Sequence, residues 1–119
     1  MTEREFTEAE ANELLPALTA SLARIRRARQ IVLEGAEPIK RSAPHNGWAA
    51  GYWEALATLR TEIESITGQG IVLRDPETGL VDFPTRREGR EAFLCWRMGE
   101  DRVGYWHGPQ TGFSGRRPL

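Results

Sequence analysis

The spacing of apolar residues changes once along this chain, and the change limits the folds that the chain can adopt. In two stretches of the N-terminal half, leucine, isoleucine and valine recur at intervals of three and four residues, which is typical of helices that bury one face. After Gly70 the apolar residues form short β-branched and aromatic runs between turn residues, which is typical of strands. The pattern predicts two helices followed by a β unit.

The two helices are predicted to form a long antiparallel hairpin over about residues 7–67. The first begins at Thr7, because Thr7 and Glu10 have the capping-box spacing, in which each side chain accepts a hydrogen bond from the backbone N–H of the other. It ends after Leu33, where glycine and proline accumulate, and the second helix begins at Trp48. A connection of about a dozen residues lets the two apolar stripes meet.

Four short strands are predicted to follow, at residues 71–73, 80–84, 91–98 and 102–107. Turn-forming residues separate them, so the strands form an antiparallel β-meander over about residues 70–107. The tail, residues 108–119, is rich in glycine and proline and is predicted to be loop-like. Together these elements predict an α+β fold in a single domain, residues 1–119.

The last two predicted strands carry apolar and aromatic residues on both faces. With Glu100 and Asp101 at the tip of their turn, Cys95 pairs with Trp106 on one face and His107 falls on the other. The helices cover one of these faces. We expect a second subunit to cover the other, so the pattern predicts self-association into a homodimer.

Composition and charge exclude several classes of protein. Of 119 residues, 39% are hydrophobic and 28% are charged, which is typical of a folded chain. The net charge of −1 predicts neither a nucleic-acid nor a membrane partner, because both attract a surplus of basic residues. The single cysteine excludes an internal disulfide, and the charged N-terminus does not resemble a signal peptide. We therefore expect a cytoplasmic protein.

Several segments together resemble a small prokaryotic family that is catalogued only as a domain of unknown function. They are FT at residues 6–7, EAN at 10–12, LLP at 14–16, GLVDFP at 79–84, LCWR at 94–97, GE at 99–100, GYWH at 104–107, GF at 112–113 and GRRPL at 115–119. The resemblance spans nearly the whole chain. It implies a stand-alone prokaryotic domain whose distinctive residues lie in the β half, and it implies no activity.

Three ionisable residues of the β half are candidates for a site. Asp82, Glu100 and His107 are of the types that ligate metals or transfer protons, and strands or turns carry all three. Their spacing matches no metal-binding or catalytic motif, so the favoured interpretation is structural: Asp82 caps or forms a salt bridge, Glu100 lies in a turn and His107 is a satisfied edge histidine. Cys95 is predicted to be buried and inert, because the inferred pairing places it on the opposite face from His107.

Arginine and tryptophan near the C-terminus suggest a second kind of site. Arg97, Trp106 and Arg116 are candidates for binding a small ligand, because guanidinium forks recognise carboxylate or phosphate and tryptophan is frequent in ligand pockets. No pattern predicts a cofactor or a bound metal. The leading hypothesis is a non-enzymatic interaction module that forms a homodimer. The alternative is a small enzyme or metal-binding domain centred on Asp82, Glu100 and His107.

Overall fold

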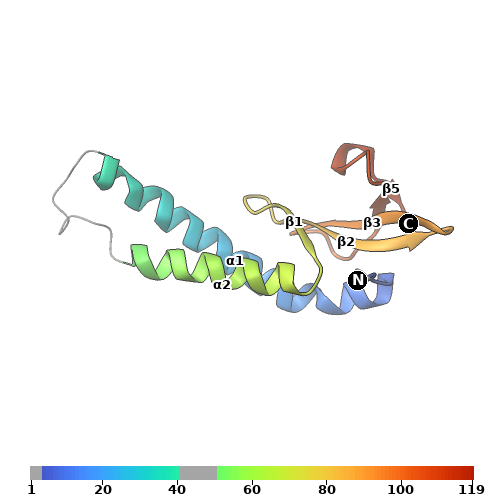
Figure 1. Cartoon of the computed structure of the whole chain (residues 1–119), viewed down its shortest axis with the longest axis horizontal. Helices are drawn as coiled ribbons and strands as arrows, with labels where there is room; N and C mark the ends of the chain where they lie inside the picture. Colours follow the sequence, from blue (N-terminus) through green and yellow to red (C-terminus); the bar gives the residue numbers. More distant parts are fainter. Residues whose placement is uncertain (1–3, 41–50) are drawn as a thin grey trace.

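The structure is a computed structural model that describes residues 4–40 and 51–119, and it shows an α+β fold. A helical hairpin is followed by one antiparallel sheet whose strands lie in chain order (Figure 1). The elements are α1 (Glu8–Lys40), α2 (Tyr52–Gly68), β1 (Val72–Asp75), β2 (Leu80–Arg87), β3 (Arg90–Arg97), β4 (Tyr105–His107), the short 3₁₀ helix η2 (Phe113–Gly115) and β5 (Arg117–Pro118). The predicted order of a hairpin and then a meander is confirmed.

The start of α1 follows the predicted capping box. The backbone N–H of Thr7 donates to Glu10 Oε1 at 2.9 Å, and the N–H of Glu10 donates to Thr7 Oγ1 at 3.0 Å. Two backbone N–H groups that no helical carbonyl can reach are therefore satisfied. Just before this cap, the N–H of Phe6 donates to the carbonyl of Pro84 at 2.8 Å, which ties the start of the chain to β2.

The end of α1 differs from the prediction. The helix continues to Lys40, past Gly35, instead of ending after Leu33. Gly35 faces the second helix so closely that a Cβ there would lie 2.5 Å from Tyr52 Cδ1. The glycine therefore permits close contact between the helices and does not end α1. The second helix begins at Tyr52, and its predicted start at Trp48 lies outside the described residues.

The hairpin packs along the predicted apolar stripe. Leu15, Leu18, Leu22 and Ile25 of α1 are buried, and Ile66 of α2 belongs to the same core. The molecule measures 58 × 30 × 24 Å, and the far end of the hairpin extends beyond the sheet (Figure 1). Among the described residues, no helix is both long enough and apolar enough to cross a bilayer.

One face of the sheet, here called the inner face, packs on the helices. Val81 pairs with Trp96 and Phe83 pairs with Leu94, and all four side chains are buried in the core. The indole N–H of the buried Trp96 has a hydrogen-bond partner, because it donates to the carbonyl of Glu100 at 3.0 Å. The residues that alternate with these four along β2 and β3 lie on the opposite face, here called the outer face.

The C-terminal tail adds a strand that the sequence did not indicate. β5 pairs with β4, so the sheet has five strands, and the N–H of Leu119 donates to the carbonyl of Gly104 at 2.9 Å. β4 would otherwise expose its outer edge, and an unpaired edge is a liability for a sheet. Proline is tolerated in β5 because β5 is itself an edge strand.

The pairing of β3 with β4 is one residue away from the prediction. Leu94 pairs with Trp106 and Cys95 with Tyr105, whereas the sequence pattern paired Cys95 with Trp106. A slip of one residue moves every side chain to the other face. Trp106 therefore lies on the inner face and His107 on the outer face. The expected homodimer rested on the other pairing, and self-association stays a prediction.

Two glycines test whether the close approach of the β1–β2 turn to Met98 requires a residue without a side chain. Gly79 and Gly89 both have positive φ, at 75° and 79°, but a Cβ at Gly79 would lie 2.7 Å from Met98 Cβ, and at Gly89 it would meet nothing within 4 Å. We expect Gly89→Ala to cost about 1–2 kcal/mol of backbone strain. Gly79→Ala should cost about 1–3 kcal/mol more, because the new methyl overpacks the core. Urea unfolding measures both, and equal losses would contradict the contact.

Candidate metal centre

Three metal-ligating side chains meet on the outer face of the sheet. Asp82 and Cys95 are opposite each other on β2 and β3, and His107 of β4 lies beside them. A carboxylate oxygen, the sulfur and an imidazole nitrogen all lie within 4.8 Å of one another. The residues are 2%, 0% and 2% exposed. We call this group the outer-face cluster.

His107 is held in one orientation by its backbone neighbour. Its Nδ1–H donates to the carbonyl of Gly108 at 2.7 Å, because a carbonyl can only accept. The ring also stacks on Phe93, with 5.4 Å between the ring centroids. Nε2 is thereby directed into the cluster, 2.9 Å from Asp82 Oδ2. A backbone carbonyl that fixes Nδ1 is the usual support of a metal-binding histidine.

The two carboxylate oxygens of Asp82 have different surroundings. Oδ2 accepts a hydrogen bond from Arg74 Nε at 2.7 Å and also faces His107. Oδ1 is buried and has no hydrogen-bond partner within the described chain. An unsatisfied buried acceptor costs about 1–3 kcal/mol. A cation bound by Oδ1 would remove this cost.

Cys95 is poorly suited to act as a nucleophile. Burial, assisted by the charge of Asp82, raises the pKa of its thiol to about 11, although Arg116 opposes the shift. A nucleophilic cysteine needs a lowered pKa and a base directed at its sulfur. Here both ring nitrogens of His107 face oxygens, those of Asp82 and Gly108. The arrangement supports metal ligation, in which the ion itself displaces the thiol proton.

Glu100 stands outside the cluster and holds the tail in place. Its carboxylate binds both terminal nitrogens of Arg116 and accepts the backbone N–H of Arg97 at 2.8 Å. Burial favours the neutral acid, but the hydrogen bonds from Arg116 and Arg97 outweigh it and lower the pKa of Glu100. The Arg116 guanidinium lies 4.0 Å from the Tyr105 ring centroid and 3.9 Å from Cys95 Sγ. The tail therefore covers the sulfur side of the cluster.

Comparison with known families matches residues 4–119 to one described as "Uncharacterized conserved protein (DUF2203)". The chain belongs to the DUF2203 family. No curated protein matches it, and no solved structure matches it. The DUF2203 description names no activity, so the functional interpretation depends on the geometry of the site.

The predicted site residues of this DUF2203 chain separate into groups. Asp82 and His107 come together, whereas Glu100 is connected to the cluster through Arg116, which contacts Cys95. The predicted ligand-binding residues also divide. Arg97 and Arg116 both stack on Phe113, 5.1 and 4.3 Å from its centroid, whereas Trp106 lies on the other face of the sheet.

Cys95 is the member of the cluster that the sequence did not indicate. Its assignment to the opposite face from His107 was wrong, because β3 and β4 are joined by residues 98–104 and not by a tight turn. In a two-residue turn the turn chemistry fixes the pairing, but in a connection of this length it does not. The pairing is set instead by contacts such as the backbone N–H of Val103, which donates to Asn12 Oδ1 at 2.8 Å.

Glu100 and its neighbour Asp101 test the attachment of the tail. Glu100→Gln should lower the free energy of unfolding by about 1–3 kcal/mol at neutral pH, because Arg116 loses a charged partner. Asp101→Asn, at an exposed position in the same turn, should change it by less than about 0.5 kcal/mol.

The loss of stability caused by Glu100→Gln should become smaller as the pH falls. Because the pKa of Glu100 is lowered by folding, its contribution is present above the ordinary carboxyl range and disappears as the pH falls through the lowered value. Urea unfolding from neutral to acidic pH measures the difference between wild type and variant. A difference that grows in acid, or that Asp101→Asn reproduces, would contradict the attachment.

Proposed function

We propose that this DUF2203 protein is a metal-binding domain that holds one transition-metal ion, with zinc as the best fit, through Asp82, Cys95 and His107. The observation that carries the proposal is the buried, unpartnered Asp82 Oδ1 beside a thiol and an oriented imidazole. Carboxylate, thiolate and imidazole are all zinc ligands. A cation would satisfy the orphan oxygen and join three strands at one point.

The surroundings of the cluster favour this assignment. In protein metal sites, the ligands are themselves oriented by hydrogen bonds from outside the first coordination sphere. Arg74 holds Oδ2 of Asp82, and the carbonyl of Gly108 holds Nδ1 of His107. Asp82 Oδ1 has no partner within the described residues, and His107 Nε2, now 2.9 Å from Asp82 Oδ2, would exchange that contact for the ion. The positive charges of Arg74 and Arg116 are balanced by the carboxylates of Asp82 and Glu100, so the cluster does not repel a cation outright.

Burial favours a structural role for the ion over a catalytic one. Catalytic zinc has three protein ligands and a position open to water and substrate, whereas structural zinc has four and is enclosed by protein. The ligand count of three resembles a catalytic site, and the enclosure resembles a structural one. All three proposed ligands are at most 2% exposed, and Arg116 lies over the sulfur side. The ion would fasten β4, and with it the tail, to β2 and β3. The small-enzyme form of the alternative hypothesis therefore has less support than the metal-binding form.

The interaction-module hypothesis keeps one supporting observation. The far part of the hairpin extends past the sheet, and there Leu33 and Trp53 are 56% and 63% exposed. Apolar surface of this kind is common where proteins associate. The outer face of the sheet offers less support than the sequence indicated, because it carries the polar cluster and the tail lies on part of it. A homodimer therefore remains a second proposal, which light scattering can test.

Cobalt titration tests the metal proposal, because Co²⁺ replaces zinc and absorbs strongly when a thiolate ligates it. Chelator-treated wild type should bind one equivalent with a thiolate-to-cobalt charge-transfer band, and added zinc should abolish the band. Cys95→Ser should lose the band. His107→Gln should weaken binding by more than about a hundredfold, because loss of a ligand costs more than loss of its outer support.

His45→Gln is the matched control, because His45 is the other histidine of the chain. It should leave the titration unchanged. Circular dichroism establishes whether each variant is folded, and the wild-type titration decides the question even if a variant is not. A folded wild type that gives no band, or a band that persists in Cys95→Ser, would overturn the proposal.

A further inference from the structure

A cavity of about 600 Å³ lies beside the tip of the β2–β3 hairpin. Its border includes Arg87, Arg90, Trp106 and Arg117. The register places these four residues on the inner face, because Arg87 pairs with Arg90 and Trp106 pairs with Arg117. These four residues therefore lie on the opposite face from the outer-face cluster, and none of them belongs to it.

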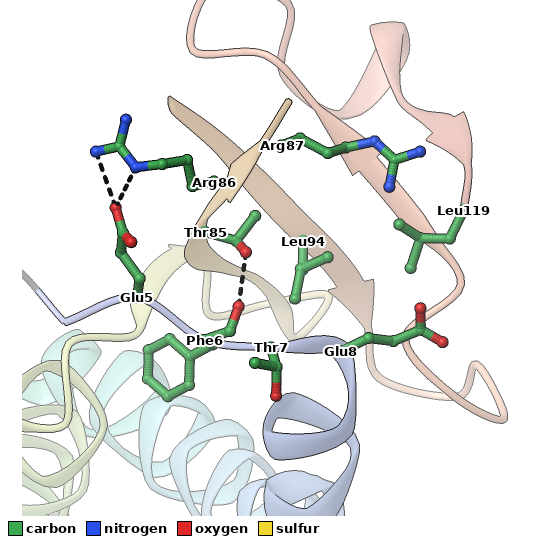
Figure 2. Close-up of a pocket in the computed structure, with 9 residues that line it drawn as sticks. All are labelled: Glu5, Phe6, Thr7, Glu8, Thr85, Arg86, Arg87, Leu94 and Leu119. Carbon is green, nitrogen blue, oxygen red and sulfur yellow. Dashed lines mark hydrogen bonds and ion pairs between the residues drawn. The ribbon is translucent and has the colours of Figure 1, made fainter. Parts of the chain in front are cut away.

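The arginines of this cavity differ from three other arginines of the β unit, although Arg97 and Arg102 resemble them in forming no ion pair within the described residues. Arg74, Arg86 and Arg116 each form an ion pair with a carboxylate. Within the described residues, Arg87, Arg90 and Arg117 form none. Figure 2 shows the contrast for two neighbours: Arg86 turns to Glu5, whereas Arg87 extends the other way, toward Leu119.

Two of these guanidinium groups lie over the indole ring of Trp106. The guanidinium of Arg87 lies 4.7 Å from the centroid of the indole, and that of Arg117 lies 5.9 Å from it. Cation–π contacts restrict long side chains that would otherwise move freely, and they leave the N–H groups unused. Part of the conformational entropy of the two arginines is thus already lost in the free protein. A ligand therefore loses less free energy in ordering them when it binds.

The charge of the cavity favours an anion. Three guanidinium groups border it, against the two carboxylates of Glu88 and Glu91. A single carboxylate ligand occupies one guanidinium fork, whereas a phosphoryl group offers three oxygens and up to two charges and can meet two forks together. The volume falls within the range of small-molecule sites, roughly 300–1,000 Å³.

From these observations we infer that the cavity binds the phosphate group of a small phosphate ester, through Arg87, Arg117 and Arg90. Arg87 also borders a second hollow of about 430 Å³, which Leu94 and Leu119 line in part (Figure 2). The organic part of such a ligand has apolar surface to contact there.

Calorimetric titration of the wild-type protein with pyrophosphate, inorganic phosphate and acetate, at one fixed ionic strength, tests the inference. Pyrophosphate should bind saturably, phosphate more weakly, and acetate not measurably. Arg87→Gln and Arg117→Gln should each weaken pyrophosphate binding by about tenfold or more, since each removes charge-assisted hydrogen bonds. Arg102→Gln, an exposed arginine that does not border the cavity, is the matched control and should bind as wild type does.

Chelator-treated wild type that remains folded separates the two sites, because it should still bind pyrophosphate: none of the three arginines belongs to the outer-face cluster. The inference is overturned if neither phosphate compound binds, if acetate binds as well as phosphate, or if Arg102→Gln weakens binding as much as the cavity variants. A short DNA duplex is the last comparison. If it binds more tightly than pyrophosphate through the same arginines, the site recognises a nucleic-acid backbone, and the small-ligand assignment fails.

Discussion

The pairing of β3 with β4 is the constraint on which the rest of the β unit depends. Because Leu94 pairs with Trp106, the tryptophan packs toward the core and the adjacent His107 is directed to the outer face. The same pairing lets Asp82, Cys95 and His107 meet. A shift of one residue would separate the histidine from the other two and would place an aromatic side chain over the carboxylate.

A buried polar cluster of this kind opposes folding unless its groups are satisfied. Arg74, Gly108 and Arg116 satisfy most of the polar atoms; Arg74 comes from β1, and the other two come from the tail. One carboxylate oxygen remains without a partner in the described chain. Natural proteins seldom leave such an atom unpaired without a reason, and a role as a cation ligand is a sufficient one. This is the ground on which we propose that the cluster binds a metal ion.

The sequence was sufficient for the order and type of the main elements but not for the site. Patterns among neighbouring residues predicted local structure correctly. The capping box predicted the start of α1 at Thr7, and the three- and four-residue spacing of leucines predicted its buried face. The predicted end of α1 near Gly35 was wrong, because glycine can either end a helix or allow two helices to approach closely. The partners Asp82 and His107 are 25 residues apart, and their contact depends on a connection whose pairing no local rule fixes. The fifth strand was missed because proline and glycine dominate the tail.

X-ray absorption at the metal edge tests the proposed metal centre most directly, because it reports the atoms around a bound ion without requiring any activity. For protein loaded with one equivalent of zinc, we expect one sulfur neighbour at about 2.3 Å and nitrogen or oxygen neighbours at about 2.0–2.2 Å. The sulfur contribution should be absent from Cys95→Ser. Zinc surrounded only by nitrogen and oxygen in the wild-type protein would place the ion elsewhere and contradict the proposed centre.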